Sequence, residues 1–167
     1  FPSSECLMSV TVMAGCAAAP PVPDWKMNAQ AAIERAVEAY LSGDARIEAR
    51  EFALARAETA RTGRPDLVAR LELVRCAAQV ASLRFDDCAG FEALRADAAA
   101  PEQAYALYLA GRSRPQDVPL LPEAQRPIAA ALVGPGVDPA ILRGVADPVS
   151  RLVAIGVVAR AGKGAAA

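Results

Sequence analysis

The chain has no histidine among its 167 residues. Histidine is the commonest general base near neutral pH and the commonest zinc ligand, so its absence removes Ser-His and Cys-His nucleophilic pairs. Because enzymes without histidine exist, the absence lowers the expectation of catalysis without abolishing it. We predict a non-enzymatic protein with no catalytic residue, no metal site and no cofactor.

Net charge and aromatic residues are also scarce. The 18 Lys and Arg residues nearly balance the 19 Asp and Glu residues, which leaves a formal net charge of −1. Nucleic-acid-binding domains carry a basic surface that neutralises phosphate, so we expect no nucleic-acid partner. Aromatic residues make up only 5% of the chain and hydrophobic residues 54%, with alanine the main contributor. This composition favours helices that pack closely around small side chains.

No segment combines β-branched residues with strict alternation, so no sheet is predicted. Apolar residues recur instead at helical spacing between proline and glycine turns. We predict an all-α fold, an irregular antiparallel bundle or repeat-like array of about six to eight helices in a single domain over residues 24–161. The 34-residue recurrence of tetratricopeptide repeats is missing.

Caps and helix breakers predict where the first helices begin and end. Asp24 and Asp44 precede helical patterns as N-cap residues, and Gly43 ends the first helix. Pro65 opens a third helix at its first turn, where its missing N–H is harmless. That third helix, to about residue 83, has the strongest core pattern because two adjacent stripes of it are apolar.

The second helix is expected to have neighbours on two sides. One of its faces carries Phe52 among alanines, and another carries Ile47 and Leu54.

The later elements are also bounded by proline or glycine. They are a short helix over 91–98, a helix from Pro101 to Gly111, a loop over 112–121, a helix from Pro122 that Pro127 kinks or delays, and helices after Asp138-Pro139 and Asp147-Pro148, the last to about residue 160.

Charged residues of the second helix alternate in sign. The mixture predicts a salt-bridged strip that faces solvent rather than an anion site. The strip contains Arg46, Arg50, Arg56, Arg61 and Arg64 with Glu48, Glu51 and Glu58. The acidic groupings Asp86-Asp87 and Glu34/Glu38 are expected to be solvated or to cap helices rather than to catalyse or bind cations.

Four aromatic residues each have two interpretations. Trp25 either packs under the first helix or rests at a lipid interface, where amphipathic rings are favoured. Tyr105 and Tyr108, with Phe91, either line a groove or belong to the core as a hydrophobic stripe at helical spacing.

Cys76 and Cys88 are spaced so that they can meet. Cys76 lies about 12 Å of helical rise before the turn at Phe85, and the extended residues from Arg84 return about the same distance. In an oxidising compartment we predict a disulfide between them. Two buried thiols are the alternative. A redox or metal role is less favoured because neither a CxxC motif nor a histidine lies beside them.

A short apolar run near the start of the chain predicts export. Leu7 to Gly15 offers about nine residues, whereas a transmembrane helix needs about 20. Small residues precede Cys16, as signal cleavage requires, and an Ala- and Pro-rich stretch follows it. We predict a signal peptide over 1–15 and a tether over 16–23. A simple secreted form and a coincidental apolar segment are the alternatives.

The tetrapeptide Met13-Ala14-Gly15-Cys16 resembles the lipobox of bacterial lipoproteins. The resemblance implies that Cys16 is diacylated on sulfur and becomes the new N-terminus. Met13 stands where leucine is commonest, and no starting methionine or basic residue precedes the run, so we expect an N-terminally truncated signal peptide. By the same resemblance, Ala17 in place of aspartate implies the periplasmic face of the outer membrane.

Most of the chain resembles an uncharacterised class of proteobacterial envelope lipoproteins. The resemblance rests on the lipobox and on the segments RCAAQVASL, residues 75–83, and DPVSRLVA, residues 147–154, within an Ala-rich helical body. It implies a membrane-anchored protein without known activity. We expect the body to bind or organise another envelope component, a protein partner. The alternatives are an accessory subunit or small-ligand carrier with an interhelical cavity and, less favoured, a histidine-free carboxylate enzyme. Residues 162–167 are expected to be a frayed tail.

Overall fold

The computed structural model describes residues 21–162 of the chain. These residues form eight α-helices and three 3₁₀ helices without a strand, which confirms the all-α prediction for this part of the chain. In chain order the elements are α1 (Asp24–Leu41), α2 (Ala45–Ala60), α3 (Pro65–Ala81), α4 (Ala89–Glu92), η1 (Arg95–Asp97), α5 (Ala100–Leu109), η2 (Pro115–Leu120), η3 (Glu123–Gln125), α6 (Arg126–Val133), α7 (Pro139–Arg143) and α8 (Pro148–Arg160). The predicted signal peptide, the first part of the tether and residues 163–167 of the tail lie outside the described residues.

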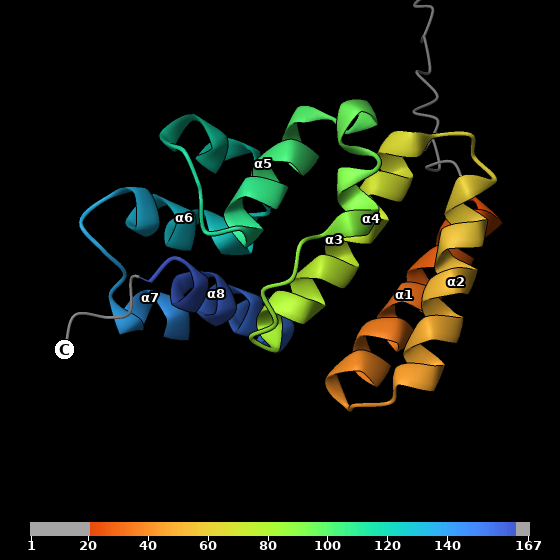
Figure 1. Ribbon diagram of the computed structural model, residues 1–167, viewed down its shortest axis with the longest axis horizontal. Coiled ribbons are helices and arrows are strands. Elements are labelled where there is room, and N and C mark those ends of the chain that lie inside the picture. Colours follow the sequence, from red (N-terminus) through yellow and green to blue (C-terminus); the bar gives the residue numbers. More distant parts are fainter. Residues whose placement is uncertain (1–20, 163–167) are drawn as a thin grey trace, which may run out of the picture.

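Helix α3 is the shared element of two hydrophobic clusters. Figure 1 shows it between the α1–α2 hairpin on one side and helices α5 to α8 on the other. Leu71 of α3 belongs to the smaller cluster, together with Ile33 of α1 and Phe52 of α2. Leu73 and Val80 of α3 belong to the larger cluster. The sequence therefore identified the strongest core helix correctly.

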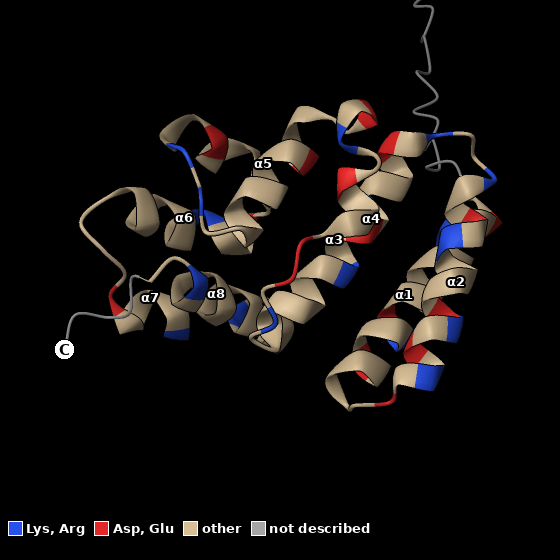
Figure 2. Ribbon diagram, viewed as in Figure 1, with Lys and Arg blue, Asp and Glu red and all other residues tan. Residues whose placement is uncertain are grey.

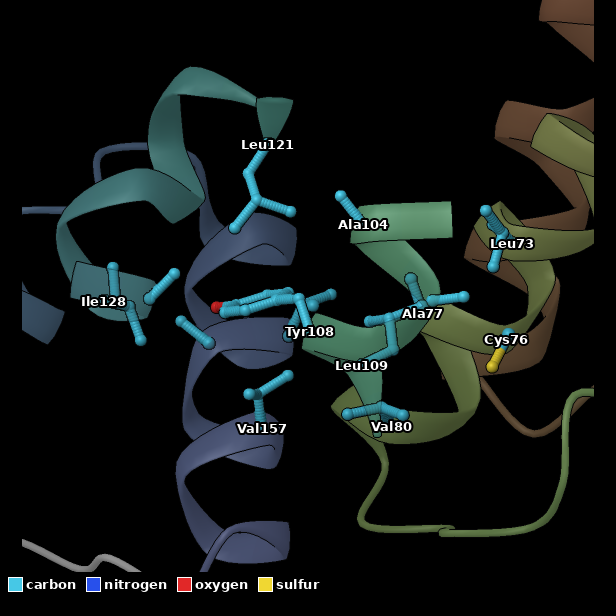
Figure 3. Close-up of a cluster of buried hydrophobic side chains, with 14 of the residues drawn as sticks. Leu73, Cys76, Ala77, Val80, Ala104, Tyr108, Leu109, Leu121, Ile128 and Val157 are labelled. Carbon is cyan, nitrogen blue, oxygen red and sulfur yellow. The ribbon is translucent and has the colours of Figure 1, made fainter. Parts of the chain in front are cut away.

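The larger cluster is centred on aromatic and branched side chains from α5, α6 and α8. Tyr108, Leu109, Ile128 and Val157 are all fully buried. Figure 3 shows Tyr108 of α5 beside α8, with Leu109 directed toward Val80 of α3. Because aromatic residues are few, these contacts supply a large share of the volume that alanines cannot fill.

A glycine sets the distance between α8 and α3. Gly156 is buried, and a Cβ built on it would overlap the backbone carbonyl oxygen of Val80. Only a residue without a side chain lets the two backbones approach this closely. The contact brings α8 against the central helix and closes the larger cluster.

Three of the predicted N-caps are present. Asp44, Asp138 and Asp147 each accept a hydrogen bond from a backbone N–H in the first turn of their helix. The predicted cap at Asp24 is wrong, because Asp24 is the first residue of α1 and Pro23 stands at the cap without a side-chain bond. The Pro23 carbonyl accepts the first backbone hydrogen bonds of the helix, so α1 begins one residue earlier than expected.

The predicted two-sided packing of the second helix is wrong. The buried residues of α2 are Glu48, Phe52, Ala55 and Thr59, whereas Ile47 and Leu54 are 48% and 45% exposed. Both α1 and α3 pack against the same side of α2. The opposite side of this helix therefore has no neighbour among the described residues.

Three later boundaries also differ from the sequence predictions. The helix expected over 91–98 is divided into α4 and η1, and the segment expected to be a loop contains η2. The helix expected from Pro122 begins as η3, and α6 follows with Pro127 in its first turn. Pro127 therefore delays the α-helix, because a proline is tolerated in the first turn and not in the interior.

Candidate binding groove

Residues from four parts of the chain surround an open groove of about 440 Å³. It lies where α3, α5, the η2–η3 segment and the first turn of α8 meet. The lining residues are mostly apolar. They are Arg70, Leu73, Val74, Pro101, Glu102, Tyr105, Leu120, Leu121, Pro122, Gln125 and Ser150.

The apolar wall of the groove is continuous with the larger cluster. Leu73 and Leu121 are each 1% exposed, whereas Leu120 beside them is 41% exposed. Tyr105 is half-buried and lines the groove, with its ring stacked on Tyr108 at a centroid distance of 6.0 Å. Of the two interpretations given above, Tyr105 fits the groove, and Tyr108 and Phe91 fit the core.

Burial raises the pKa of Tyr105. Its hydroxyl therefore keeps its proton at neutral pH and is able to donate a hydrogen bond. A protonated tyrosine within an apolar wall offers a bound molecule both ring area and one polar contact.

Buried hydrogen bonds hold the part of the groove formed by η3 and α8 in place. The Tyr108 hydroxyl donates to Gln125 Oε1 at 2.5 Å, and Gln125 Nε2 donates to the Ser150 carbonyl oxygen at 3.0 Å. Gln125 is only 2% exposed. It thus connects α5, η3 and α8 with both ends of its amide satisfied. No motif in the sequence marked Gln125, since its role depends on partners 17 and 25 residues away.

One ion pair lies at the opposite side of the groove. Arg70 Nε of α3 donates to Glu102 Oε1 of α5 at 2.8 Å. The Glu102 side chain is 8% exposed and the Arg70 side chain 66%. The buried carboxylate fixes the stem of the guanidinium, while its terminal nitrogens have no partner among the described residues. Charge among the groove's lining residues is therefore confined to this one ion pair.

The charged strip predicted along the second helix is only partly solvent-facing. Glu48 of α2 is buried and accepts two hydrogen bonds from Arg75 of α3, and Glu72 of α3 is buried and accepts one from Arg56 of α2. Both pairs connect α2 and α3, but the carboxylate belongs to α2 in the first pair and to α3 in the second. They connect helices, and their carboxylates are withdrawn from solvent, unlike the surface strip that the sequence predicted.

Glu51 of that strip also pairs between helices, with Arg35 of α1. Two further pairs are local: Arg61, at the C-cap of α2, pairs with Glu58, and Arg64 pairs with Asp66 at the start of α3. Arg46 and Arg50 are exposed and make no ion pair with any described residue. Figure 2 shows several of these basic segments along α2.

The predicted disulfide between Cys76 and Cys88 is present, with a Cα–Cα distance of 5.6 Å. Cys76 is buried on α3, and Cys88 stands at the start of α4. The bridge therefore fastens the return segment after α3 to the central helix. In that segment Asp86 is exposed and bonded to Arg84, and its neighbour Asp87 is exposed.

Other predicted positions remain apart from the groove. Glu34 and Glu38 are exposed on α1, and Trp25 is half-buried in the first turn of that helix. Within residues 21–162 no group of three or more carboxylate or cysteine residues has a metal-binding arrangement. In the same range no helix is both long and apolar enough to cross a membrane. The predicted lipidation site, Cys16, lies outside the described residues.

Comparisons with protein-family models, with curated proteins and with solved structures gave no match.

The N-cap of α8 positions Ser150 at the groove and gives a pH-dependent contribution to stability. The Ser150 backbone N–H donates to Asp147 Oδ2 at 2.7 Å, and this hydrogen bonding lowers the pKa of Asp147 from its ordinary value of 3.8. A carboxyl with a lowered folded-state pKa stabilises the fold above its unfolded pKa and loses that contribution as pH falls.

We predict that Asp147→Ala lowers the free energy of unfolding by about 1 kcal/mol at pH 7, the usual cost of losing an N-cap. The difference from the unsubstituted protein should shrink as pH falls through and below about 4. Urea denaturation at pH 7 and pH 3 measures both values. A difference that is the same at the two pH values would contradict the assigned role of the carboxylate.

Proposed function

We propose that this protein is a membrane-anchored bacterial lipoprotein whose helical body acts as a non-enzymatic binding module in the cell envelope. The groove beside Tyr105 is the observation that carries the proposal for the body. The resemblance of Met13-Ala14-Gly15-Cys16 to a lipobox carries the proposal for the anchor. The two parts rest on separate residues and are tested separately.

The groove's lining favours an apolar segment of a protein partner. Its walls are mostly leucine, valine, proline and tyrosine side chains, and the only charged side chains among its lining residues are the ion-paired Arg70 and Glu102. An apolar surface with few charged groups is typical of the core of protein interfaces. Leu120 is 41% exposed at the edge of the groove, which places apolar surface where a partner's side chain would cover it.

The proposed anchor keeps the body close to the bilayer. The seven residues between Cys16 and Asp24 span at most about 25 Å when fully extended. A partner in the same membrane, or one that is itself attached to it, would then meet the groove at a raised effective concentration. A modest apolar groove is sufficient for binding under that condition.

A second candidate, a small-ligand carrier, is favoured by the size of the groove. Its volume of about 440 Å³ falls within the roughly 300–1,000 Å³ typical of small-molecule sites. An apolar metabolite or lipid fragment would pack on Tyr105 and accept a hydrogen bond from its hydroxyl. Native mass spectrometry of gently purified protein distinguishes this candidate, because a retained ligand adds a fixed mass.

The anchor predicts a specific chemical modification. In cells fed radioactive palmitate, the protein should be labelled, and Cys16→Ser should abolish the label because the sulfur is the proposed acylation site. Cys88→Ser serves as the control. Cys88 is bonded to Cys76 and is not the proposed acylation site, so this substitution should leave the label intact. An unlabelled protein, or equal labelling of the Cys16→Ser variant, would contradict the anchor.

The groove predicts a position-dependent crosslink. A photoreactive amino acid at Leu120 should give a protein adduct in native cells, whereas the same residue at Ile155 of α8 should not. The two residues are equally exposed, at 41%, and only Leu120 lines the groove. Equal adducts at both positions, or none at Leu120, would contradict partner binding in the groove.

A further inference from the structure

The outer faces of α1 and α2 carry two rows of exposed residues with alternating spacings of three and four. On α1 the row is Met27, Ala31, Glu34, Glu38 and Leu41, here called the acidic seam. On α2 it is Ile47, Arg50, Leu54, Ala57 and, at the C-cap, Arg61, here called the basic seam. All ten residues are exposed to solvent.

Both seams are more apolar than an outer helix face needs to be. Met27 is 52% exposed, Ile47 48%, Leu54 45% and Leu41 36%. A small alanine lies within each seam and allows a close approach by another helix. Spacings of three and four repeat at an average of 3.5 residues, which is the period of helices that pack together as coiled coils.

The charges in the two seams have opposite signs. The acidic seam contains only glutamates as charged residues, and the basic seam contains only arginines. Glu38 and Arg50 make no ion pair with any described residue, and Glu34 has only a hydrogen bond from Gln30. Each seam therefore presents a charge that the other would neutralise.

Within one protomer the two seams do not meet. The α1–α2 hairpin is closed by the smaller cluster on its inner side, where Ile33, Ala36, Phe52 and Ala55 are buried. Its ion pair between the helices joins Arg35 and Glu51, neither of which belongs to a seam. The complementary partner of each seam must consequently come from outside the described part of the chain.

We propose that this surface binds a second copy of the chain, so that two α1–α2 hairpins form an antiparallel four-helix bundle. A two-fold axis sets the acidic seam of one protomer against the basic seam of its partner and repeats the contact in the other direction. The same chain thus supplies both halves of the charge complementarity. Glutamate and arginine within otherwise apolar seams also fix the register of such helices.

The dimensions of the hairpin suit this arrangement. The 18 residues of α1 and 16 of α2 correspond to lengths of about 27 Å and 24 Å. Each helix therefore presents its seam over more than two heptads. The bundle leaves the groove beside Tyr105 free, because none of the groove's lining residues belongs to α1 or α2.

The association should be visible in sedimentation equilibrium of the full 167-residue chain carrying Cys6→Ser and Cys16→Ser, so that neither acylation nor an intermolecular disulfide drives it. We expect a concentration-dependent monomer–dimer equilibrium. Leu54→Glu should raise the dimer dissociation constant roughly 10- to 100-fold, as for loss of a central apolar contact. Leu152→Glu on α8 is the matched control, since Leu152 is 42% exposed and lies outside both seams.

Charge reversal tests the pairing of the two seams. Glu38→Arg and Arg50→Glu should each weaken the dimer by about 10-fold, because each substitution acts twice across the two-fold axis. The double variant should regain most of the affinity, since the complementary charges are then exchanged. The melting temperatures of all variants should stay near the melting temperature of the parent chain, because the substituted side chains are exposed.

Three results would overturn the proposal. One is a parent chain that remains monomeric at every concentration. Another is equal weakening by Leu54→Glu and Leu152→Glu. The last is a double charge variant as weak as the single variants, which would show that the opposite charges do not meet.

Discussion

The close approach of α8 to α3 at Gly156 is the contact on which the larger part of the fold depends. At this point the backbone of one helix lies against the carbonyl of Val80, with no room for a side chain. The contact sets the position of α8, and the Ser150 carbonyl in its first turn accepts the hydrogen bond from Gln125. The part of the groove formed by η3 and α8 is thus fixed by a contact between two backbones.

Helix α3 carries this constraint to the rest of the molecule. One side of the helix completes the larger cluster and contributes Leu73 to the groove. Its other side packs on the α1–α2 hairpin, where Arg75 and Glu72 pair with residues of α2. Because buried carboxylates are costly without a partner, these pairs specify how the hairpin is placed on α3. Helix α3 therefore contacts both the groove and the hairpin that carries the two seams.

Local signals in the sequence predicted local structure well. Aspartates before helices at positions 44, 138 and 147 act as caps, because a cap needs only residues two or three positions away. The Cys76–Cys88 bridge followed from helical rise and a short return segment. Phe52 was correctly placed in the core, but Ile47 and Leu54 were expected to be covered as well. Hydrophobicity alone does not reveal whether a second face has a neighbour.

The groove and the buried charges could not be predicted in the same way. Tyr105, Leu120 and Ser150 come from three separate elements, and only the tertiary arrangement brings them around one space. Glu48 and Glu72 look like surface residues of amphipathic helices, yet arginines on a neighbouring helix allow them to be buried. Gln125 carries no pattern at all, since its two partners lie far along the chain.

The substitution Gly156→Ala tests the central contact most directly, because the two possible outcomes have opposite signs. On helix propensity alone, alanine would stabilise α8 by about 1 kcal/mol relative to glycine. Our account predicts instead a loss of about 1–3 kcal/mol in the free energy of unfolding, as for overpacking in a rigid core, measured by urea denaturation with the disulfide intact. An unchanged or increased stability would contradict it.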